Sequence, residues 1–540
     1  STQGYSSAAS DVYKRQILAA VILTTSCSLD EVNKSSLTSD NYFASNTEFD
    51  ELVTNVYVST RGLLRDQQSP MWHGTDLYEG QGQITDAPFP VNDYTIMGGN
   101  EFAGWWWANY QIITKANQAL TRGKANKNLS ADFYAVREAE LLSLRAYAYF
   151  NLVESFGGVP LILTEPDGPV YDLTRASEVD VYKQIINDLK ISLEPGRLPY
   201  YPETLGRVSQ GFANHLLAKV LLTRSYKDFA EPEDLTDAIK YAKTALELHP
   251  MLEGTNSWDL LFGETDYQRD NSEIIFSVCY STDQAYNDGG NNLYRHFKLN
   301  WDQFPGGGRV APYWRCDASF QPTSFFFELY DETDIRGSEK FLKRTIPAGV
   351  DFEDEQYGTI KAGDPILYFP RKAMTEAEKK EYMDSHKPIY AVVNPDEYHT
   401  LIIPGNTAYP TVWKFADPNI NTYETGNALG TRDTYVFRSA ESLLLLAEAY
   451  VKQGRGDLAQ ELINKLRTRA GASLLDRAAT IDDVLDESAR ELFGEANRWM
   501  DLKRCGKLLE RVVKYNAQAK HQHPDNKIPD YFLLRPIPLD

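Results

Sequence analysis

The sequence predicts a mainly α-helical protein in which helical hairpins flank a large, irregular, loop-rich insert with short strands. First, apolar residues recur at steps of three and four on two sides of Phe133–Phe156, which is typical of a buried helix. Second, two predicted hairpins with small residues at the helix crossing are of the tetratricopeptide type. They pair a helix ending near Asp228 with Leu235–Leu248, and Ser439–Lys452 with Asp457–Arg469. Third, the stretch between the hairpins lacks helical periodicity and is rich in Gly, Pro, Asn and aromatic residues.

The composition limits the possible function classes. The chain has 540 residues, a net charge of -21 and 12% aromatic residues. A field of this sign repels phosphate backbones, so nucleic acid is not an expected partner. The aromatic content favours a protein that stacks flat ligands or sugar faces, although a tyrosine-rich core would produce the same count.

The N-terminal segment has the pattern of a secretion signal. Basic residues precede the apolar run Ile17–Leu23, and small residues then lead to Cys27. Seven apolar residues are too few to span a bilayer, which needs about 20. Residues 1–27 therefore predict a signal segment with a lipobox-like, lipid-anchored Cys27, and the polar residues 28–40 predict a tether.

The other predicted elements follow from periodicity and from Gly and Pro positions. In chain order they are a helix over 41–61, an irregular stretch over 65–104, a helix starting at Trp105–Trp107, an amphipathic helix over Glu178–Leu193, a buried strand in Ile274–Tyr280, and one continuous helix over Arg490–Arg504. In that last helix, Arg498 is expected to pair at the surface with Glu495 and Asp501, three residues away on either side.

Several strings closely resemble signatures of the SusD/RagB family, the nutrient-binding outer-membrane lipoproteins of Bacteroidota. They are LRAYAYFNLVESFGGVPLIL at 144–163, RELFGEANRWMDLKR at 490–504 and LLRPIP at 533–538. The resemblance implies one SusD-like domain over 41–540, with a helical scaffold at 41–250 and 436–510 and the insert at 251–435. It also implies a surface-exposed, lipid-anchored protein that binds an oligosaccharide without catalysis and delivers it to a TonB-dependent, SusC-like transporter.

Other readings stay open at this stage. No G-x-S-x-G, Walker or H-E-x-x-H motif occurs, but 76 acidic residues leave a glycoside hydrolase possible. Relatives that handle peptides leave a peptide or another nutrient as an alternative. No cofactor is expected. A structural Ca²⁺ could use oxygens in the polar run Asp283, Asn287, Asp288 and Asn292, although the spacing is not that of an EF-hand.

Two aromatic-rich loops are the predicted sugar-binding shelf. The region is suggested by the resemblance, and the residue types by the stacking of sugar C–H faces on aromatic rings and the pairing of hydroxyls with polar side chains. The candidates are Trp72, Asp76, Tyr94 and Asn100 in the first loop, and Tyr286, Trp301, Arg309 and Trp314 in the second. Of the cysteines, Cys279 is expected in the core, and a Cys279–Cys316 disulfide stays possible.

Overall fold

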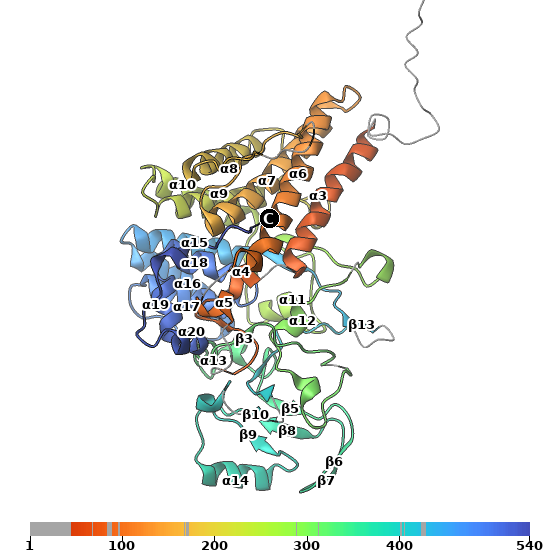
Figure 1. Ribbon diagram of the computed structural model, residues 1–540, viewed down its shortest axis with the longest axis vertical. Helices are drawn as coiled ribbons and strands as arrows, with labels where there is room; N and C mark the ends of the chain where they lie inside the picture. Colours follow the sequence, from red (N-terminus) through yellow and green to blue (C-terminus); the bar gives the residue numbers. More distant parts are fainter. Residues whose placement is uncertain are drawn as a thin grey trace, which may run out of the picture.

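The computed structural model describes residues 45–539, except 67–68, 84–88, 96–97, 167, 169–171, 288, 312, 400–401, 404–405 and 423–427. Cys27 and the tether lie outside these residues. Helices dominate the described part, and the strands are short, which confirms the mainly α fold class. The chain forms an upper group of helices, a middle group and a lower lobe that contains most of the short strands (Figure 1).

The upper group is built around the helix that the sequence singled out. It contains α3 (Asn46–Asp66), α6 (Ala103–Ala125), α7 (Ala131–Phe156), α8 (Glu178–Ser192), α9 (Gln210–Arg224) and α10 (Asp234–Leu248). Helix α7 packs against both α6 and α8, so its two apolar sides are both covered. Its buried Arg145 is matched by Asp188 of α8 at 2.8 Å, which fixes the two helices relative to each other.

The second hairpin is also confirmed. Helix α15 (Ser439–Lys452) packs against α16 (Gly456–Ala470) and also against α10 of the first hairpin. Lys219 of α9 reaches Glu441 of α15 at 2.6 Å, and both side chains are buried. The two hairpins therefore form one continuous helical layer, although almost 200 residues separate them in the sequence.

The prediction of one helix over Arg490–Arg504 is wrong. The structure has α17 (Ile481–Leu492) and α18 (Arg498–Arg504), with Gly494 in a left-handed conformation (φ 75°) between them. The break turns Glu495 inward, where it meets Arg438 at 2.6 Å instead of pairing with Arg498 at the surface. One continuous helix could not direct both Glu495 and Arg498 to their buried partners, and the chain therefore leaves the helix between α17 and α18.

The C-terminal part continues as short helices beside the middle group. They are α19 (Leu508–Tyr515) and α20 (Ala517–Gln522), which pack against each other. Helix α20 also contacts α5 (Pro90–Asp93), a short helix in the stretch predicted to be irregular.

The insert begins and ends in one small sheet. The predicted strand is β2 (Ile274–Val278), and it pairs antiparallel with β15 (Thr434–Arg438), so the two ends of the insert lie side by side. Between them the lower lobe holds the three-stranded sheet of β5 (Thr345–Pro347), β8 (Pro365–Tyr368) and β9 (Ala391–Val392), the hairpin of β6 (Phe352–Asp354) and β7 (Gly358–Ile360), and α14 (Glu376–Ser385) (Figure 1). Cys279 and Cys316 are both free thiols, so the possible disulfide is not formed.

A buried ionic cluster clamps this small sheet to the helices. Arg438 at the end of β15 contacts Glu273 at 2.8 Å and Glu491 of α17 at 2.7 Å. Arg469 of α16 contacts the same two carboxylates at 2.7 and 2.5 Å. Burial alone would raise the pKa of Glu273, but Arg469 and Arg438 lower it below its usual value. The cluster is therefore charged and mutually satisfied.

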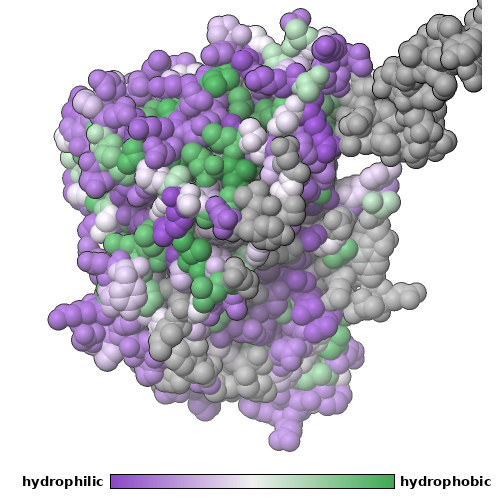
Figure 2. Space-filling model, turned by 45° about the horizontal axis from the view of Figure 1, so that its top comes forward, coloured by the Kyte–Doolittle hydropathy of each residue, from purple (hydrophilic) through white to green (hydrophobic). Residues whose placement is uncertain are grey.

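The surface seen in Figure 2 is mostly hydrophilic. Figure 2 shows hydrophobic residues in patches among mostly hydrophilic ones on the face that carries the upper helices. Of the helices that the structure describes, none is long and apolar enough to cross a membrane.

Candidate functional site

An open groove of about 450 Å³ lies between α3, the turn 204–207, strand β2 and the loop that carries Tyr286. Its volume is in the range of small-ligand sites. Apolar side chains such as Val58, Phe276 and Val278 line it together with hydroxyl groups and two arginines. Tyr286 is 72% exposed, so its ring is free to stack against a ligand at the mouth of the groove.

Arg61 of α3 positions the loop that carries Tyr286. Its guanidinium donates to the carbonyl oxygens of Cys279 at 2.7 Å and Tyr286 at 3.4 Å. The same guanidinium lies over the ring of Tyr280, 5.0 Å from its centroid. The exposed tyrosine is therefore attached to the scaffold through its own backbone, which lowers the ordering cost of a contact with its ring.

Gly206 is the glycine in the turn that lines the groove. This residue is left-handed (φ 84°), and a Cβ built on it would come within 2.7 Å of the Cys279 sulfur and 3.3 Å of the Ser277 carbonyl oxygen. The turn therefore lies directly over the edge of β2, and only glycine fits there.

Behind the groove, polar side chains of three segments, α3, α7 and the turn 204–207, form one network. Arg207 contacts Asp50 at 2.6 Å and Glu140 at 2.9 Å, and Tyr57 donates to Glu140 at 2.6 Å. Burial and the neighbouring Glu140 raise the pKa of Tyr57 well above its usual value, so the phenol stays protonated. The network fixes the angle between α3 and the turn 204–207, which sets the width of the groove.

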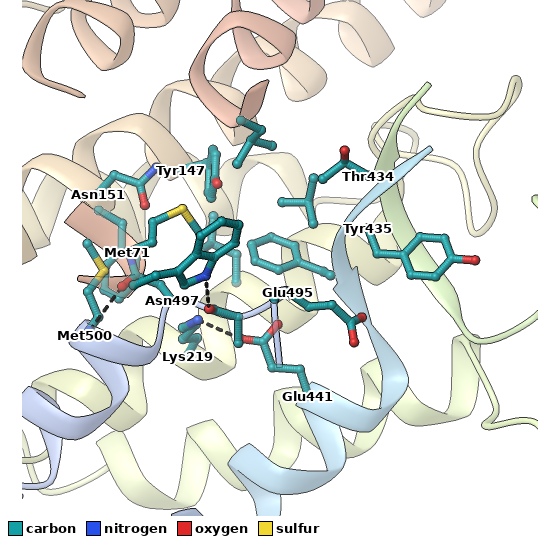
Figure 3. Close-up of a pocket in the computed structure, with 18 of the residues that line it drawn as sticks. Met71, Tyr147, Asn151, Lys219, Thr434, Tyr435, Glu441, Glu495, Asn497 and Met500 are labelled. Atoms are coloured by element: carbon teal, nitrogen blue, oxygen red, sulfur yellow. Dashed lines mark hydrogen bonds and ion pairs between the residues drawn. The ribbon is translucent and has the colours of Figure 1, made fainter. Parts of the chain in front are cut away.

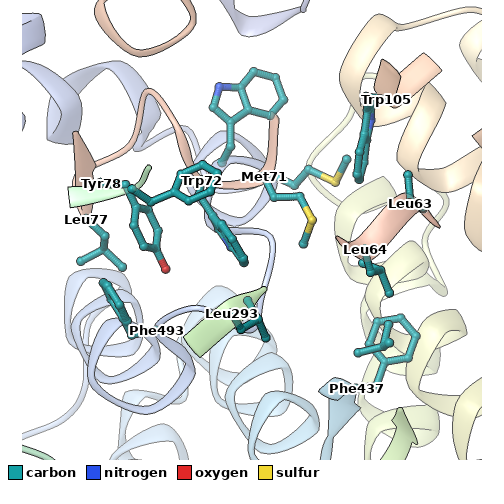
Figure 4. Close-up of a cluster of buried hydrophobic side chains, with 14 of the residues drawn as sticks. Leu63, Leu64, Met71, Trp72, Leu77, Tyr78, Trp105, Leu293, Phe437 and Phe493 are labelled. Carbon is teal, nitrogen blue, oxygen red and sulfur yellow. The ribbon is translucent and has the colours of Figure 1, made fainter. Parts of the chain in front are cut away.

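Of the eight predicted shelf residues, Tyr286 is the one that lines this groove. Trp72 and Tyr94 are in the core, where they are 2% and 1% exposed, so the prediction that they face a ligand is wrong. Trp72 packs on Tyr78 with ring centroids 5.8 Å apart (Figure 4). It also packs on Phe320 at 4.9 Å, and its indole N–H donates to the carbonyl of Ala496. The hydroxyl of Tyr94 donates to the carbonyl of Gly74 and accepts from Trp499.

Asp76 is likewise a scaffold residue and not a ligand-binding one. It is fully buried, and its carboxylate accepts two bonds from Arg498 at 2.8 and 2.7 Å and one from Arg511 at 2.7 Å. Burial would raise its pKa, but the two arginines outweigh burial and hold the pKa below its usual value. The stretch predicted as a surface loop is therefore pinned to the C-terminal helices.

The other four predicted residues are spread over different surroundings. Trp301 is fully buried, stacks on Tyr313 at 4.4 Å and donates to the Pro347 carbonyl, so it is also not a shelf residue. Trp314 is half-buried and packs against Tyr294 and Ile420. Asn100 and Arg309 are exposed, and Arg309 contacts Asp302 at 3.0 Å. None of these four lines the groove.

The interior beneath the groove region is tightly filled. A cavity of about 30 Å³, enough for a water molecule, is lined by Met71, Trp72, Lys219 and Glu441 among others. Figure 3 shows Lys219 pointing toward Glu441 and Asn497 bonded to the backbone of Met500. The charges there are paired within the core, so this cavity is a packing feature.

A second, larger groove of about 1080 Å³ runs between α10, the loop 250–255, α15 and α16. Leucines dominate its lining, with Tyr450 as an aromatic member and Lys243, Glu253, Glu461 and Lys465 among its charged ones. It is the concave face that the peptide-binding alternative requires.

The described residues contain no group of three or more His, Cys, Asp or Glu placed to hold a metal ion. Asp288, part of the calcium alternative, lies outside them. The lining of the Tyr286 groove contains no Asp or Glu among the described residues, so no carboxylate pair for acid–base cleavage of a glycoside is present in it. The groove offers an aromatic ring for stacking, hydroxyl groups and guanidinium donors, and each of these can contact a bound ligand.

The sequence did hold signals for the residues that it did not nominate. Arg207-Val208-Ser209-Gln210-Gly211 reads as a turn into a helix, and the groove uses the start of that turn. Arg61 lies at the end of the predicted first helix. Their approach to Tyr286 is a long-range contact that no local pattern contains.

The fold and the groove define a class: a helical-hairpin scaffold that carries a ligand-sized surface groove beside a loop-rich insert. The SusD family profile matches residues 272–537, and a second profile, described as starch-binding associating with outer membrane, matches residues 26–222. The chain belongs to the SusD family.

Individual relatives support the same family assignment. The starch-binding protein SusD of Bacteroides thetaiotaomicron is 33% identical over 418 residues, which cover 75% of this chain and 70% of that protein. SusD-like protein P25 of Formosa agariphila is 22% identical and covers 97% of this chain and 96% of its own. Among solved structures, surface glycan-binding protein A of Bacteroides thetaiotaomicron in complex with laminarihexaose has a TM-score of 0.66 at 17% identity, covering 92% of this chain and 96% of that one.

Proposed function

We propose that this protein binds an oligosaccharide in the Tyr286 groove and leaves it chemically unaltered. The observation that carries the proposal is the exposed ring of Tyr286, whose backbone carbonyl accepts a bond from Arg61, in the lining of a groove of about 450 Å³ that also contains apolar side chains. A sugar ring can place its C–H face on the tyrosine while its hydroxyls bond to Thr54, Thr204 and the guanidinium of Arg61.

Membership of the SusD family supports this assignment. A relative at 33% identity is a starch-binding protein, and a structural neighbour was solved with laminarihexaose. Binding through several weak contacts corresponds to micromolar to millimolar dissociation constants, about -4 to -8 kcal/mol.

We further propose that the chain is a lipid-anchored lipoprotein of the outer membrane that hands its ligand to a SusC-like, TonB-dependent transporter. The lipobox-like Cys27 and the match to a family described as associating with the outer membrane support it. Co-purification of the transporter with the tagged full-length protein from membranes tests the partnership, and replacement of Cys27 by Ala should release the protein from the membrane.

The binding site is tested by isothermal titration of glycans into the purified chain. Tyr286→Ala should weaken binding by about 3- to 10-fold, because one aromatic contact contributes about 0.5–1.5 kcal/mol. Tyr531→Ala is the matched control, since Tyr531 is 71% exposed and lies outside the groove. Equal affinity of wild type and Tyr286→Ala for every glycan that binds would reject this groove as the site.

A peptide is the second candidate ligand, and the leucine-rich groove between α10 and α16 is the feature that favours it. Titration of a mixed peptide library against the wild type and a Leu462→Asp variant decides this alternative. Peptide binding lost in Leu462→Asp, with no glycan binding, would replace the proposal above.

A further inference from the structure

The lining of the Tyr286 groove has a charge opposite to that of the rest of the molecule. The chain has 76 acidic and 55 basic residues, yet among the described residues the groove is lined by two arginines and by no aspartate or glutamate. A concave site lined by one sign of charge attracts a ligand of the opposite sign only if that charge is not balanced by partners behind the lining. The question is whether both arginines are already neutralised.

The charge of Arg207 is fully used inside the protein. Its two terminal nitrogens contact Glu140 at 2.9 Å and Asp50 at 2.6 Å. Arg137 shares the same two carboxylates at 2.7 and 2.6 Å, and Glu203 completes the cluster. This group of three acids and two arginines has no positive charge left for a ligand.

The charge of Arg61 is not neutralised in this way. Its bonds go to the carbonyl oxygens of Cys279 and Tyr286, which accept hydrogen bonds but carry no charge. In the part of the chain that the structure describes, no carboxylate lies within ion-pair distance of it. The acid that it influences, Asp433, is held by Arg269 at 2.8 Å and by the N–H of Tyr280 at 2.9 Å.

The guanidinium of Arg61 still has donors to offer. A guanidinium carries five N–H groups in a planar fork, and the two carbonyl bonds use two of them. The fork suits carboxylate and sulfate oxygens, which it can bind with two parallel bonds. Because Arg61 also bonds to the backbone of Tyr286, the positive charge and the stacking ring lie at the same end of the groove.

We propose that the groove selects an anionic glycan, an oligosaccharide with carboxylate or sulfate groups, whose acidic group binds Arg61 while an adjacent ring stacks on Tyr286. This inference rests on the proposed glycan-binding function and specifies its substrate class. An exposed aromatic ring next to an unmatched guanidinium is the arrangement that an acidic sugar requires.

The test compares an oligogalacturonate with its carboxyl-reduced form by isothermal titration against the full chain. The two ligands differ only in the charged group. The acidic form should bind about tenfold more tightly at low salt, since the reduced form cannot make the charge-assisted hydrogen bonds to Arg61. That preference should shrink in high salt, where the screening length falls to about 3 Å at 1 M. A sulfated oligosaccharide without carboxylates in a parallel titration separates sulfate from carboxylate as the preferred group.

Arg61→Gln should abolish the preference for the acidic form, with a smaller loss of affinity for the reduced form because Arg61 also supports the Tyr286 loop. Arg61→Lys should keep part of it, because charge remains but the fork is lost. Arg455→Gln is the matched control: it removes an exposed arginine, paired with Asp457, that directly precedes α16. Thermal melts of each variant confirm that it is folded.

Several results would overturn the inference. Equal affinity of wild type for the acidic and the reduced form rejects it, and so does an equal loss for both forms in Arg61→Gln, which would make Arg61 only a support of the Tyr286 loop. Tighter binding of an acidic peptide than of either glycan also rejects it. If the reduced form binds in a Tyr286-dependent way without any acid preference, the proposed function stands and only the anionic class fails.

Discussion

Two segments that are rich in Gly and aromatic residues have the same sequence pattern, but one is buried in the structure and the other is exposed. The stretch around Asp76 threads through the interior, with Trp72, Asp76 and Tyr94 buried. The loop around Tyr286 stays at the surface and lines a groove. The difference lies in their partners: two arginines from α18 and α19 reach Asp76, whereas Arg61 reaches only backbone carbonyls of the second loop. Charged side chains that reach a segment from elsewhere in the chain decide whether that segment is buried. The composition of the segment itself does not.

The largest expected effect is the removal of the carboxylate that anchors the buried segment. Asp76→Ala leaves Arg498 and Arg511 charged and without this partner in the core, which should lower the free energy of unfolding by about 3–5 kcal/mol. Denaturant unfolding measures it. Asp351→Ala, at an exposed ion pair with Lys361, is the control and should leave the unfolding transition nearly unchanged. A small effect of Asp76→Ala would contradict the anchoring role.

The buried segment should also be sensitive to pH through Glu79. Burial raises the pKa of Glu79 to about 7, with Asp93 adding to the rise and backbone N–H bonds opposing it. The folded state therefore holds a proton that the unfolded state has released, so stability falls as pH rises toward 7 and is then constant. His399, 3.9 Å away, has its pKa lowered by burial to about 4 and stays neutral in this range.

Glu79→Gln isolates this effect, because the amide resembles the protonated acid. Relative to this variant, the wild type should lose about 2–3 kcal/mol of unfolding free energy between pH 5 and pH 8. Parallel pH dependences of the two proteins would show that Glu79 is ionised in the fold throughout.

A smaller loss is expected for Trp301→Phe. The change removes the indole N–H bond to the Pro347 carbonyl and part of the stack on Tyr313, which should cost about 1–3 kcal/mol of unfolding free energy. Glycan affinity of the folded fraction should not change, since Trp301 is remote from the lining of the Tyr286 groove. A loss of glycan affinity without a loss of stability would show that Trp301 contributes to ligand binding.

The smallest effect on stability belongs to the exposed loop. Tyr286→Ala should change the free energy of unfolding by less than about 0.5 kcal/mol, because the ring is exposed and its backbone contacts stay in place. Its effect should appear in glycan titration instead. A marked drop in melting temperature would show that Tyr286 supports the fold and would weaken its assignment to the groove.

The scaffold was predictable because its signals are local. The periodicity of α7, the small residues of the two hairpins and the apolar run of β2 all placed elements close to their observed bounds. The break at Gly494 was missed because the reason for it, Glu495 turning to Arg438, is a contact with a distant strand. The same holds for the groove: Tyr286 was nominated from its residue type and lines the groove, but Arg61 and Gly206 become groove residues only through the tertiary fold.

The pairing of β2 with β15 has a consequence for how such chains diversify. Both ends of the insert leave the scaffold at this two-stranded sheet. The buried cluster of Arg438, Arg469, Glu273 and Glu491 holds the sheet against the helices. The residues between these two strands are nevertheless tied to the helices, because buried Arg336 contacts Glu487 and Glu491 of α17 and buried Lys414 contacts Glu495. A chimaera that takes residues 279–433 from another relative should therefore fold on this scaffold only if the incoming segment supplies cations for these carboxylates.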